Sequence, residues 1–166
     1  MPLLMQLRSL RNYIKTSLSE DQVQNLQDFQ SLRFRGLQNL VYRTIFGSNL
    51  KALALIYSTD KWGSHWYSQH YETHFAPLRR KKINVLEIGI GGYKNPKHGG
   101  GSLRMWRTYF PKARVFGIDI YDKSLHDERR IKTFKGSQVD DVFMESVLKE
   151  TGPIDIVIDD GSHKNE

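Results

Sequence analysis

The stretch NVLEIGIGG, residues 84–92, decides the fold of this 166-residue chain. It is an apolar run that ends abruptly in glycines, and a run without polar alternation is typical of a strand buried on both faces in a parallel sheet. Glycine permits positive φ angles and a close approach of the backbone to a ligand, and Gly89 and Gly91 stand where the chain must turn. The sequence therefore predicts a strand, a tight turn and then a helix.

A strand, a glycine-rich turn and a helix form the first unit of a Rossmann-like site, whose ligand lies beyond the carboxyl ends of the strands. An insert at residues 93–98 separates the glycines of this turn from the next glycines, at residues 99–101. Glycines spaced in this way are poorly suited to hold a pyrophosphate. Glu87 precedes the turn, and a carboxylate there favours a cationic ligand over a phosphate. The pattern E-x-G-x-G resembles the first motif of class I methyltransferases, whose cofactor S-adenosylmethionine is a sulfonium; the alternative is a glycine-rich turn in another α/β domain.

Composition fits one globular domain with a helical appendage. The chain is 39% hydrophobic, carries a formal charge of +7 and has no cysteine, which excludes disulfides and thiolate metal sites. The lack of cysteine fits a cytoplasmic location. Excess positive charge raises nucleic acid or an acidic membrane as a partner, but the basic residues are scattered, which favours a solvated surface. We find no apolar run long enough for a transmembrane segment and no signal peptide.

Residues 1–58 are predicted to form a helical N-terminal segment that precedes the α/β part at residues 59–166. Apolar residues recur there at helical spacing, at Leu3, Leu7, Leu10, Ile14 and Leu18. This stripe favours packing on the domain or on a second subunit of a homo-oligomer, with membrane-surface binding or a transit role as alternatives. Ser19 and Gln22 predict the start of a second helix.

Residues 58–75 are rich in aromatic and imidazole side chains. His70 and His74 would share a helix face, but Tyr71 stands where a zinc protease needs glutamate, so zinc is not expected. Helical spacing also relates a second set, Tyr67, Tyr71, Phe75 and Leu78. This set predicts a core face, and a lid over the cofactor is the alternative interpretation.

The middle of the chain predicts a helix and two more strands. Ser102 is the expected N-cap of the helix, with Leu103, Trp106 and Phe110 on its buried face. A second strand, residues 115–119, ends in Asp119, a carboxylate placed to accept hydrogen bonds from both ribose hydroxyls of a nucleoside.

Asp122 lies three residues after Asp119, in the loop that follows the second predicted strand, and is interpreted as a turn residue. A third strand at residues 132–136 leads to Ser137 and Gln138, which we expect beside the adenine, and Asp140 is a candidate cap for the next helix.

The fourth predicted strand, residues 154–159, is followed by Asp160 and His163. Asp159, Asp160 and the imidazole lie at a carboxyl end, where such folds place their sites, and carboxylate oxygens suit Mg²⁺. The alternative is an acidic turn with His163 as a helix cap. Residues 158–163 lack the Pro-Pro-aromatic platform of methyltransferases that modify nucleic-acid bases, which argues against a base as substrate.

Six motifs occur in one order along the chain: TDK at 59–61 with His65 and Tyr67, LEIG at 86–89, GGGSLRMW at 99–106, GIDI at 117–120, GSQ at 136–138 and IDDGSH at 158–163. Together they resemble the metal-dependent sugar O-methyltransferases of macrolide biosynthesis, the mycinamicin and tylosin tailoring type. The resemblance implies transfer of the methyl group of S-adenosylmethionine to a sugar hydroxyl of a glycoside, with Mg²⁺ at the site. It implies that Asp160 is a metal ligand and that His163 is a base. It also implies a cofactor pocket formed by Glu87, Gly89, Gly91, Asp119 and Gln138. Ser137 and Asp159 are predicted to complete the cofactor-binding set.

The expected fold is thus α/β, a Rossmann-like class I methyltransferase fold that is truncated after the fourth strand. Such a fold needs more strands than these, so we expect either a fragment or a sheet completed by a partner chain. A cofactor-binding or nucleic-acid-binding module without sugar methylation is the alternative function.

Overall fold

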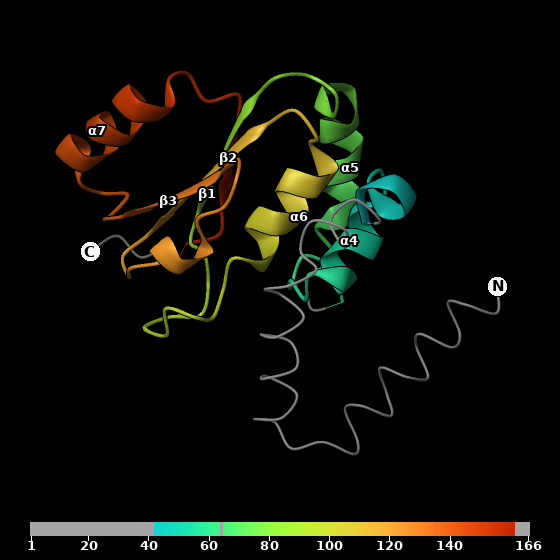
Figure 1. Ribbon diagram of the computed structural model, residues 1–166, viewed down its shortest axis with the longest axis horizontal. Helices are drawn as coiled ribbons and strands as arrows, with labels where there is room; N and C mark the ends of the chain where they lie inside the picture. Colours follow the sequence, from blue (N-terminus) through green and yellow to red (C-terminus); the bar gives the residue numbers. More distant parts are fainter. Residues whose placement is uncertain (1–41, 64, 162–166) are drawn as a thin grey trace, which may run out of the picture. The chain divides into compact units, whose positions relative to one another are not determined.

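The computed structural model describes residues 42–63 and 65–161 (Figure 1). Contacts divide the chain into Met1–Val41 and Tyr42–Glu166, and the second unit contains every described residue. The predicted helices before residue 42 and the predicted base His163 lie outside the described residues. Regular elements follow one another as α4 (Leu50–Ile56), α5 (Ser68–Phe75), η1 (Ala76–Leu78), β1 (Asn84–Ile88), α6 (Gly101–Tyr109), β2 (Arg114–Asp119), η2 (Ser124–His126), β3 (Ile131–Lys135), α7 (Asp141–Thr151) and β4 (Ile156–Asp159).

The four strands form one parallel sheet in the order β3-β2-β1-β4. In the register, Ile88 at the end of β1 pairs with Ile118 of β2 and Asp159 of β4. The carboxyl ends of these strands therefore meet at one edge, and the segments that follow them converge there. The predicted α/β fold with four parallel strands is confirmed, with strand ends that differ from the expected ones by one or two residues.

Helices cover both faces of the sheet, as Figure 1 shows with α7 on one side and α4, α5 and α6 on the other. On the α6 face, the rings of Tyr71 and Phe75 pack at 5.3 and 5.9 Å from the ring of Trp106. The predicted core face of α5 is confirmed at these residues, whereas Tyr67 is 42% exposed. His70 and His74 are both exposed.

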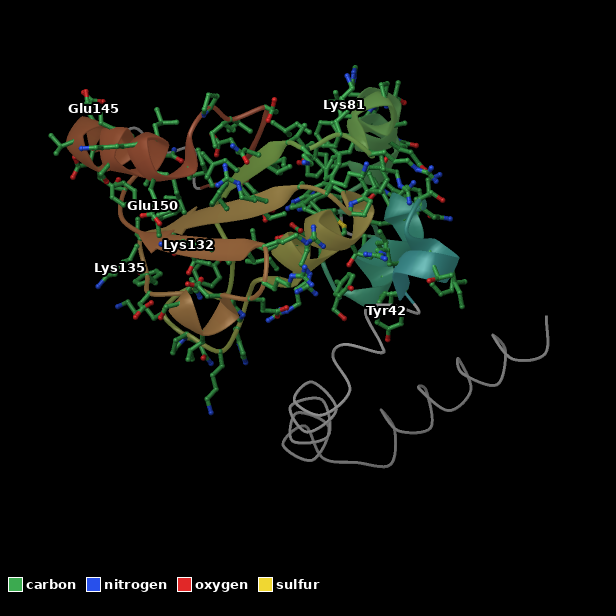
Figure 2. All side chains as sticks on the ribbon, turned by 45° about the horizontal axis from the view of Figure 1, so that its top comes forward. Tyr42, Lys81, Lys132, Lys135, Glu145 and Glu150 are labelled. Carbon is green, nitrogen blue, oxygen red and sulfur yellow. The ribbon has the colours of Figure 1, made fainter. Side chains whose placement is uncertain are left out.

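The α7 face has a smaller core, in which Leu86, Phe116 and Ile118 pack with Val147. Asp140 caps α7, since its Oδ1 accepts a hydrogen bond from Phe143 N at 3.0 Å, as predicted. Lys132 of β3 and Glu150 of α7 form an exposed ion pair on this side (Figure 2), of a kind that contributes at most about 1 kcal/mol.

The prediction that Ser102 caps α6 is wrong. Gly100 is the N-cap, with φ 69° and no side-chain cap. Ser102 lies in the first turn and its hydroxyl donates instead to Glu87 Oε2 at 2.6 Å. The reason is that Glu87 is fully buried, and a buried carboxylate requires donors more strongly than an exposed helix terminus requires an acceptor.

The predicted division at residue 58 stays a prediction, because most of the N-terminal segment lies outside the described residues. The described part of that segment packs into the domain: Leu50, Leu53 and Ala54 of α4 belong to the same core as α6. Within residues 42–63 and 65–161, no helix has the length and apolar character needed to cross a bilayer.

Candidate active site

A cavity of about 580 Å³ lies at the carboxyl edge of the sheet, a size typical of small-molecule sites. Segments that follow all four strands line it. Six of the residues singled out in the sequence are on its wall: Gly89, Gly91, Asp119, Ser137, Gln138 and Asp160. A second cavity of about 300 Å³ shares Asp60, Gly89, Gly91 and Asp160 with the first.

The lining of the larger cavity is acidic. Asp60, Asp119 and Asp160 contribute carboxylates, and none of the described lining residues is lysine or arginine. At the edge of the smaller cavity, Lys61 is the basic side chain. Because close opposite charges attract and a cavity wall is less polarisable than water, the larger cavity favours a cationic ligand and disfavours a phosphate.

The two glycines of the β1 turn serve different purposes. Gly89 has φ 85°, and a Cβ there would lie 2.6 Å from the carbonyl oxygen of Asp160. Gly91 has φ 78°, and a Cβ there would meet no atom within 4 Å. Gly89 thus lets the turn pass directly against the end of β4, whereas Gly91 leaves open space at the cavity wall.

Asp119 is held in place by the turns around it. Its Oδ2 accepts from Ile90 N at 3.0 Å and its Oδ1 accepts from Tyr121 N at 2.9 Å. Each carboxylate oxygen retains a lone pair, so both can also accept from a ligand. Asp122, by contrast, caps a turn at Ser124, whose amide lowers the pKa of Asp122, and it does not line the cavity.

Gln138 lines the cavity. Its Oε1 is buried, and none of the described residues donates a hydrogen bond to it. Such an atom is costly unless a donor reaches it, so it marks a place for a donor on a ligand. The neighbouring Ser137 accepts a long hydrogen bond of 3.4 Å from Val139 N.

A cluster of charged side chains lies beside the cavity, and sequence reasoning missed its buried centre, Lys61. This side chain is 1% exposed; its ammonium donates to Asp60 at 3.1 Å and to Asp160, and lies 3.9 Å from Glu87 Oε1. Burial alone would lower the pKa of Lys61, but the surrounding carboxylates, Glu87 first, raise it to about 12. The TDK motif contained this lysine, yet nothing local signals that a lysine will be buried.

Glu87 lies beneath the cavity rather than on its wall. Burial raises the pKa of Glu87 to about 7, against the opposing effects of the Lys61 ammonium and the Ser102 hydroxyl. None of the described residues forms a hydrogen bond with its Oε1. Its role as a cofactor contact remains a prediction.

Asp159, the last residue of β4, and the adjacent Asp160 have different partners. Asp159 Oδ1 accepts from Gly161 N at 3.0 Å, while Asp160 has a 35% exposed side chain that pairs with Lys61. Among residues 42–63 and 65–161, no three histidine, cysteine or acidic side chains gather as a metal cluster. Asp160 is therefore a candidate magnesium ligand, but the described residues do not supply a complete ligand set.

Together, the parallel sheet, the glycine turn after β1, the carboxylate at the end of β2 and the acidic cavity define a Rossmann-like domain of the class I methyltransferase type. Comparison with solved structures agrees: this chain superimposes on the MycE methyltransferase from the mycinamycin biosynthetic pathway, solved in complex with Mg, SAH and mycinamycin VI, with a TM-score of 0.67 and 51% identity. The match covers 69% of this chain and 32% of that structure.

The curated proteins that this chain resembles are O-methyltransferases. The 8-demethyl-8-(2-methoxy-alpha-L-rhamnosyl)-tetracenomycin-C 3'-O-methyltransferase of Streptomyces olivaceus is 56% identical over 116 residues, which are 69% of this chain and 30% of the relative. The mycinamicin VI 2''-O-methyltransferase of Micromonospora griseorubida is 51% identical over 70% of this chain and 30% of its own length. The demethylmacrocin O-methyltransferase of Streptomyces fradiae is 50% identical over 71% of this chain and 30% of its own length.

The predicted resemblance to macrolide sugar O-methyltransferases is confirmed, and this chain spans about 30% of the length of these relatives. No protein-family model matches the chain.

Proposed function

We propose that this chain supplies the cofactor pocket of an S-adenosylmethionine-dependent O-methyltransferase that modifies a sugar hydroxyl of a glycoside. The observation that carries the proposal is the acidic cavity at the carboxyl edge of the sheet, in a chain that is 46–56% identical to sugar O-methyltransferases. A sulfonium cofactor has the charge that such a cavity attracts.

The cavity residues fit that cofactor group by group. Asp119 is positioned to accept from the ribose hydroxyls, and the unpartnered Oε1 of Gln138 suits the amino group of the adenine. The open space beside Gly91 leaves room for the ligand, and Asp60 and Asp160 offer carboxylates to its positive groups. The MycE complexes contain SAH, the product of S-adenosylmethionine after methyl transfer, which supports the same assignment.

We further propose Asp160 as a ligand of Mg²⁺, the ion in the MycE complexes, and His163 as the general base. Carboxylate oxygen is the donor that Mg²⁺ prefers, and the cation supplies Lewis acidity, which lowers the pKa of a sugar hydroxyl. An imidazole titrates near neutrality and is suited to take the hydroxyl proton, a contribution of roughly 10²- to 10⁴-fold in rate. The pocket would hold the sugar hydroxyl in line with the methyl group of the cofactor.

Calorimetric titration of the chain with S-adenosylmethionine tests the pocket. Asp119→Asn is expected to weaken binding at least tenfold, because a hydrogen bond to a charged group contributes about 1.5–3 kcal/mol. Asp122→Asn is the matched control, since Asp122 lies outside the cavity, and its affinity should equal that of the unchanged chain. Equal affinities for all three proteins would remove Asp119 from the cofactor site.

Methyl transfer to a rhamnosyl glycoside, measured with labelled cofactor, tests the reaction. His163→Ala should bind the cofactor normally and transfer no methyl group, whereas full turnover by this variant would exclude His163 as the base. Cofactor binding that Mg²⁺ leaves unchanged, without turnover, would favour a binding module instead. The proposed partner is a small-molecule glycoside, with a homo-oligomer and a cytoplasmic location as further parts of the proposal.

A further inference from the structure

The loop at residues 92–99 borders the cavity and has no helix or strand of its own. Tyr93 in this loop is 85% exposed, lines the larger cavity and adopts φ 45°, an uncommon conformation for a side chain of its size. The loop turns back on itself, since a Cβ at Gly92 would lie 2.3 Å from the carbonyl oxygen of His98. Side chains of the domain form hydrogen bonds with the backbone of this loop.

The buried side chain of Lys123 contacts the backbone of this loop. Its side chain is 1% exposed, and its ammonium donates to three backbone carbonyls of the loop, those of Tyr93 at 2.8 Å, Asn95 at 2.9 Å and His98 at 3.1 Å. An ammonium has three donors, so all of them are used. No carboxylate pairs with it among the described residues, so carbonyl dipoles alone surround the charge, as they surround a metal ion in a carbonyl-lined cation site.

A second contact fixes the far end of the loop. Arg104 can only donate, so its 3.0 Å contact assigns His126 Nδ1 as an acceptor and leaves Nε2–H to donate to the His98 carbonyl at 3.2 Å. His98 is thus held by both Lys123 and His126, whereas Tyr93 and Asn95 are held through Lys123. The loop segment nearest the cavity therefore depends on the ammonium.

We propose that Lys123 is a positioning residue whose ammonium acts as a built-in cation: it organises the carbonyls of residues 92–99 and thereby fixes Tyr93 at the rim of the cavity. The effect on the loop is a property of the described geometry. Its consequence for ligand affinity rests on the proposed function.

Hydrogen–deuterium exchange of the full chain tests the anchor. In Lys123→Ala, loop amides such as His98 N, which donates to Asn95 O at 3.2 Å, should exchange at least tenfold faster, while amides of α7 stay unchanged. Propylammonium replaces the deleted part of the side chain and should restore slow exchange in this variant; tetramethylammonium, which has no N–H donor, should not. Lys132→Ala, which removes an exposed lysine of β3, is the matched control and should leave the loop unchanged.

Lys123→Met keeps most of the packing volume and removes the donors. It should increase exchange in the loop as Lys123→Ala does. Propylammonium should have no effect on this variant, because the methionine side chain fills the space that the lysine side chain occupied. Unchanged loop exchange in either variant, faster exchange throughout the domain, or failure of propylammonium to restore Lys123→Ala would overturn the proposal, and so would failure of both variants to fold, since Lys123 would then be a core residue.

Affinity is measured separately by calorimetry with S-adenosylmethionine. Lys123→Met should bind it at least fivefold more weakly than the unchanged chain. If the unchanged chain does not bind this cofactor, the proposed function fails while the exchange results still decide the role of Lys123. If both proteins bind with equal affinity, the loop does not contribute to the cofactor site and the rim role of Tyr93 is refuted.

Discussion

Replacement of Glu87 by glutamine should change how the stability of the domain depends on pH. Burial raises the pKa of this carboxyl from 4.5 to about 7, so the folded protein holds the proton more tightly than the unfolded chain does. The resulting stabilisation is complete below pH 4.5 and is lost as the pH rises through about 7. Glu87→Gln carries a neutral group at every pH and retains an acceptor for the Ser102 hydroxyl, so it should not show this loss.

The size of the effect follows from the shift. At about 1.36 kcal/mol per pKa unit, a rise from 4.5 to about 7 corresponds to about 3 kcal/mol of unfolding free energy. Lys61, with its pKa raised to about 12, stays charged throughout this range and does not contribute to the pH dependence. His126 titrates in both proteins and cancels in their difference.

The measurement is urea denaturation at pH 5 and pH 8.5, without divalent cations. The unfolding free energy of the unchanged chain relative to that of Glu87→Gln should fall by roughly 2–3 kcal/mol between the two conditions. Glu145→Gln, which changes an exposed carboxyl of α7 (Figure 2), is the control and should follow the unchanged chain. Parallel curves for the unchanged chain and Glu87→Gln would show that the carboxyl is ionised in the folded protein at all these pH values, and the reasoning would be wrong.

Two further predictions concern the glycine turn and the loop anchor. Gly91→Ala should cost about 1–2 kcal/mol because of its positive φ alone, and Gly89→Ala should cost clearly more, because its Cβ would also lie 2.6 Å from the Asp160 carbonyl; equal urea midpoints would contradict this. Burial, followed by the charge of Arg104, lowers the pKa of His126 below 6.5, so the neutral imidazole stabilises the fold at higher pH and that contribution is lost as the pH falls below 6.5. In thermal melts from pH 7 to pH 5, His126→Gln should therefore lose less stability than the unchanged chain, and an equal or larger loss would argue against a neutral, anchoring His126.

Much of the architecture could be predicted because it depends on patterns that are local in the sequence. An unbroken apolar run marks β1, whose two faces are both covered, whereas burial alternates along the edge strand β4. Polar residues at the ends of both strands mark the site edge. Asp119 and Asp122 could be told apart by their distance from the end of β2. The structure places Asp119 on the cavity wall and Asp122 in a turn.

The rest could not be predicted because it depends on partners distant in sequence. Ser102 satisfies the local rule for an N-cap, but the carboxylate it meets is 15 residues earlier. Glu87 has Gly117 as its register partner in β2, so both are on the sheet face that α6 covers, and its side chain points to Ser102 rather than into the cavity. Lys61 and Lys123 are of a type that is almost always exposed, and only the fold brings carboxylates and carbonyls around them.

The charge of the whole chain and the charge of its site have opposite signs, and this difference supports the proposed methyltransferase function over a nucleic-acid-binding module. A formal charge of +7 predicts attraction of nucleic acid, which requires basic side chains that phosphates can reach. Two of the lysines, Lys61 and Lys123, are buried, and the ammonium group of each donates to acceptors of the chain itself. The larger cavity, by contrast, presents Asp60, Asp119 and Asp160. Interactions at a few ångströms outweigh a scattered surface charge that salt screens, so the charge of the site supports the proposed cationic cofactor.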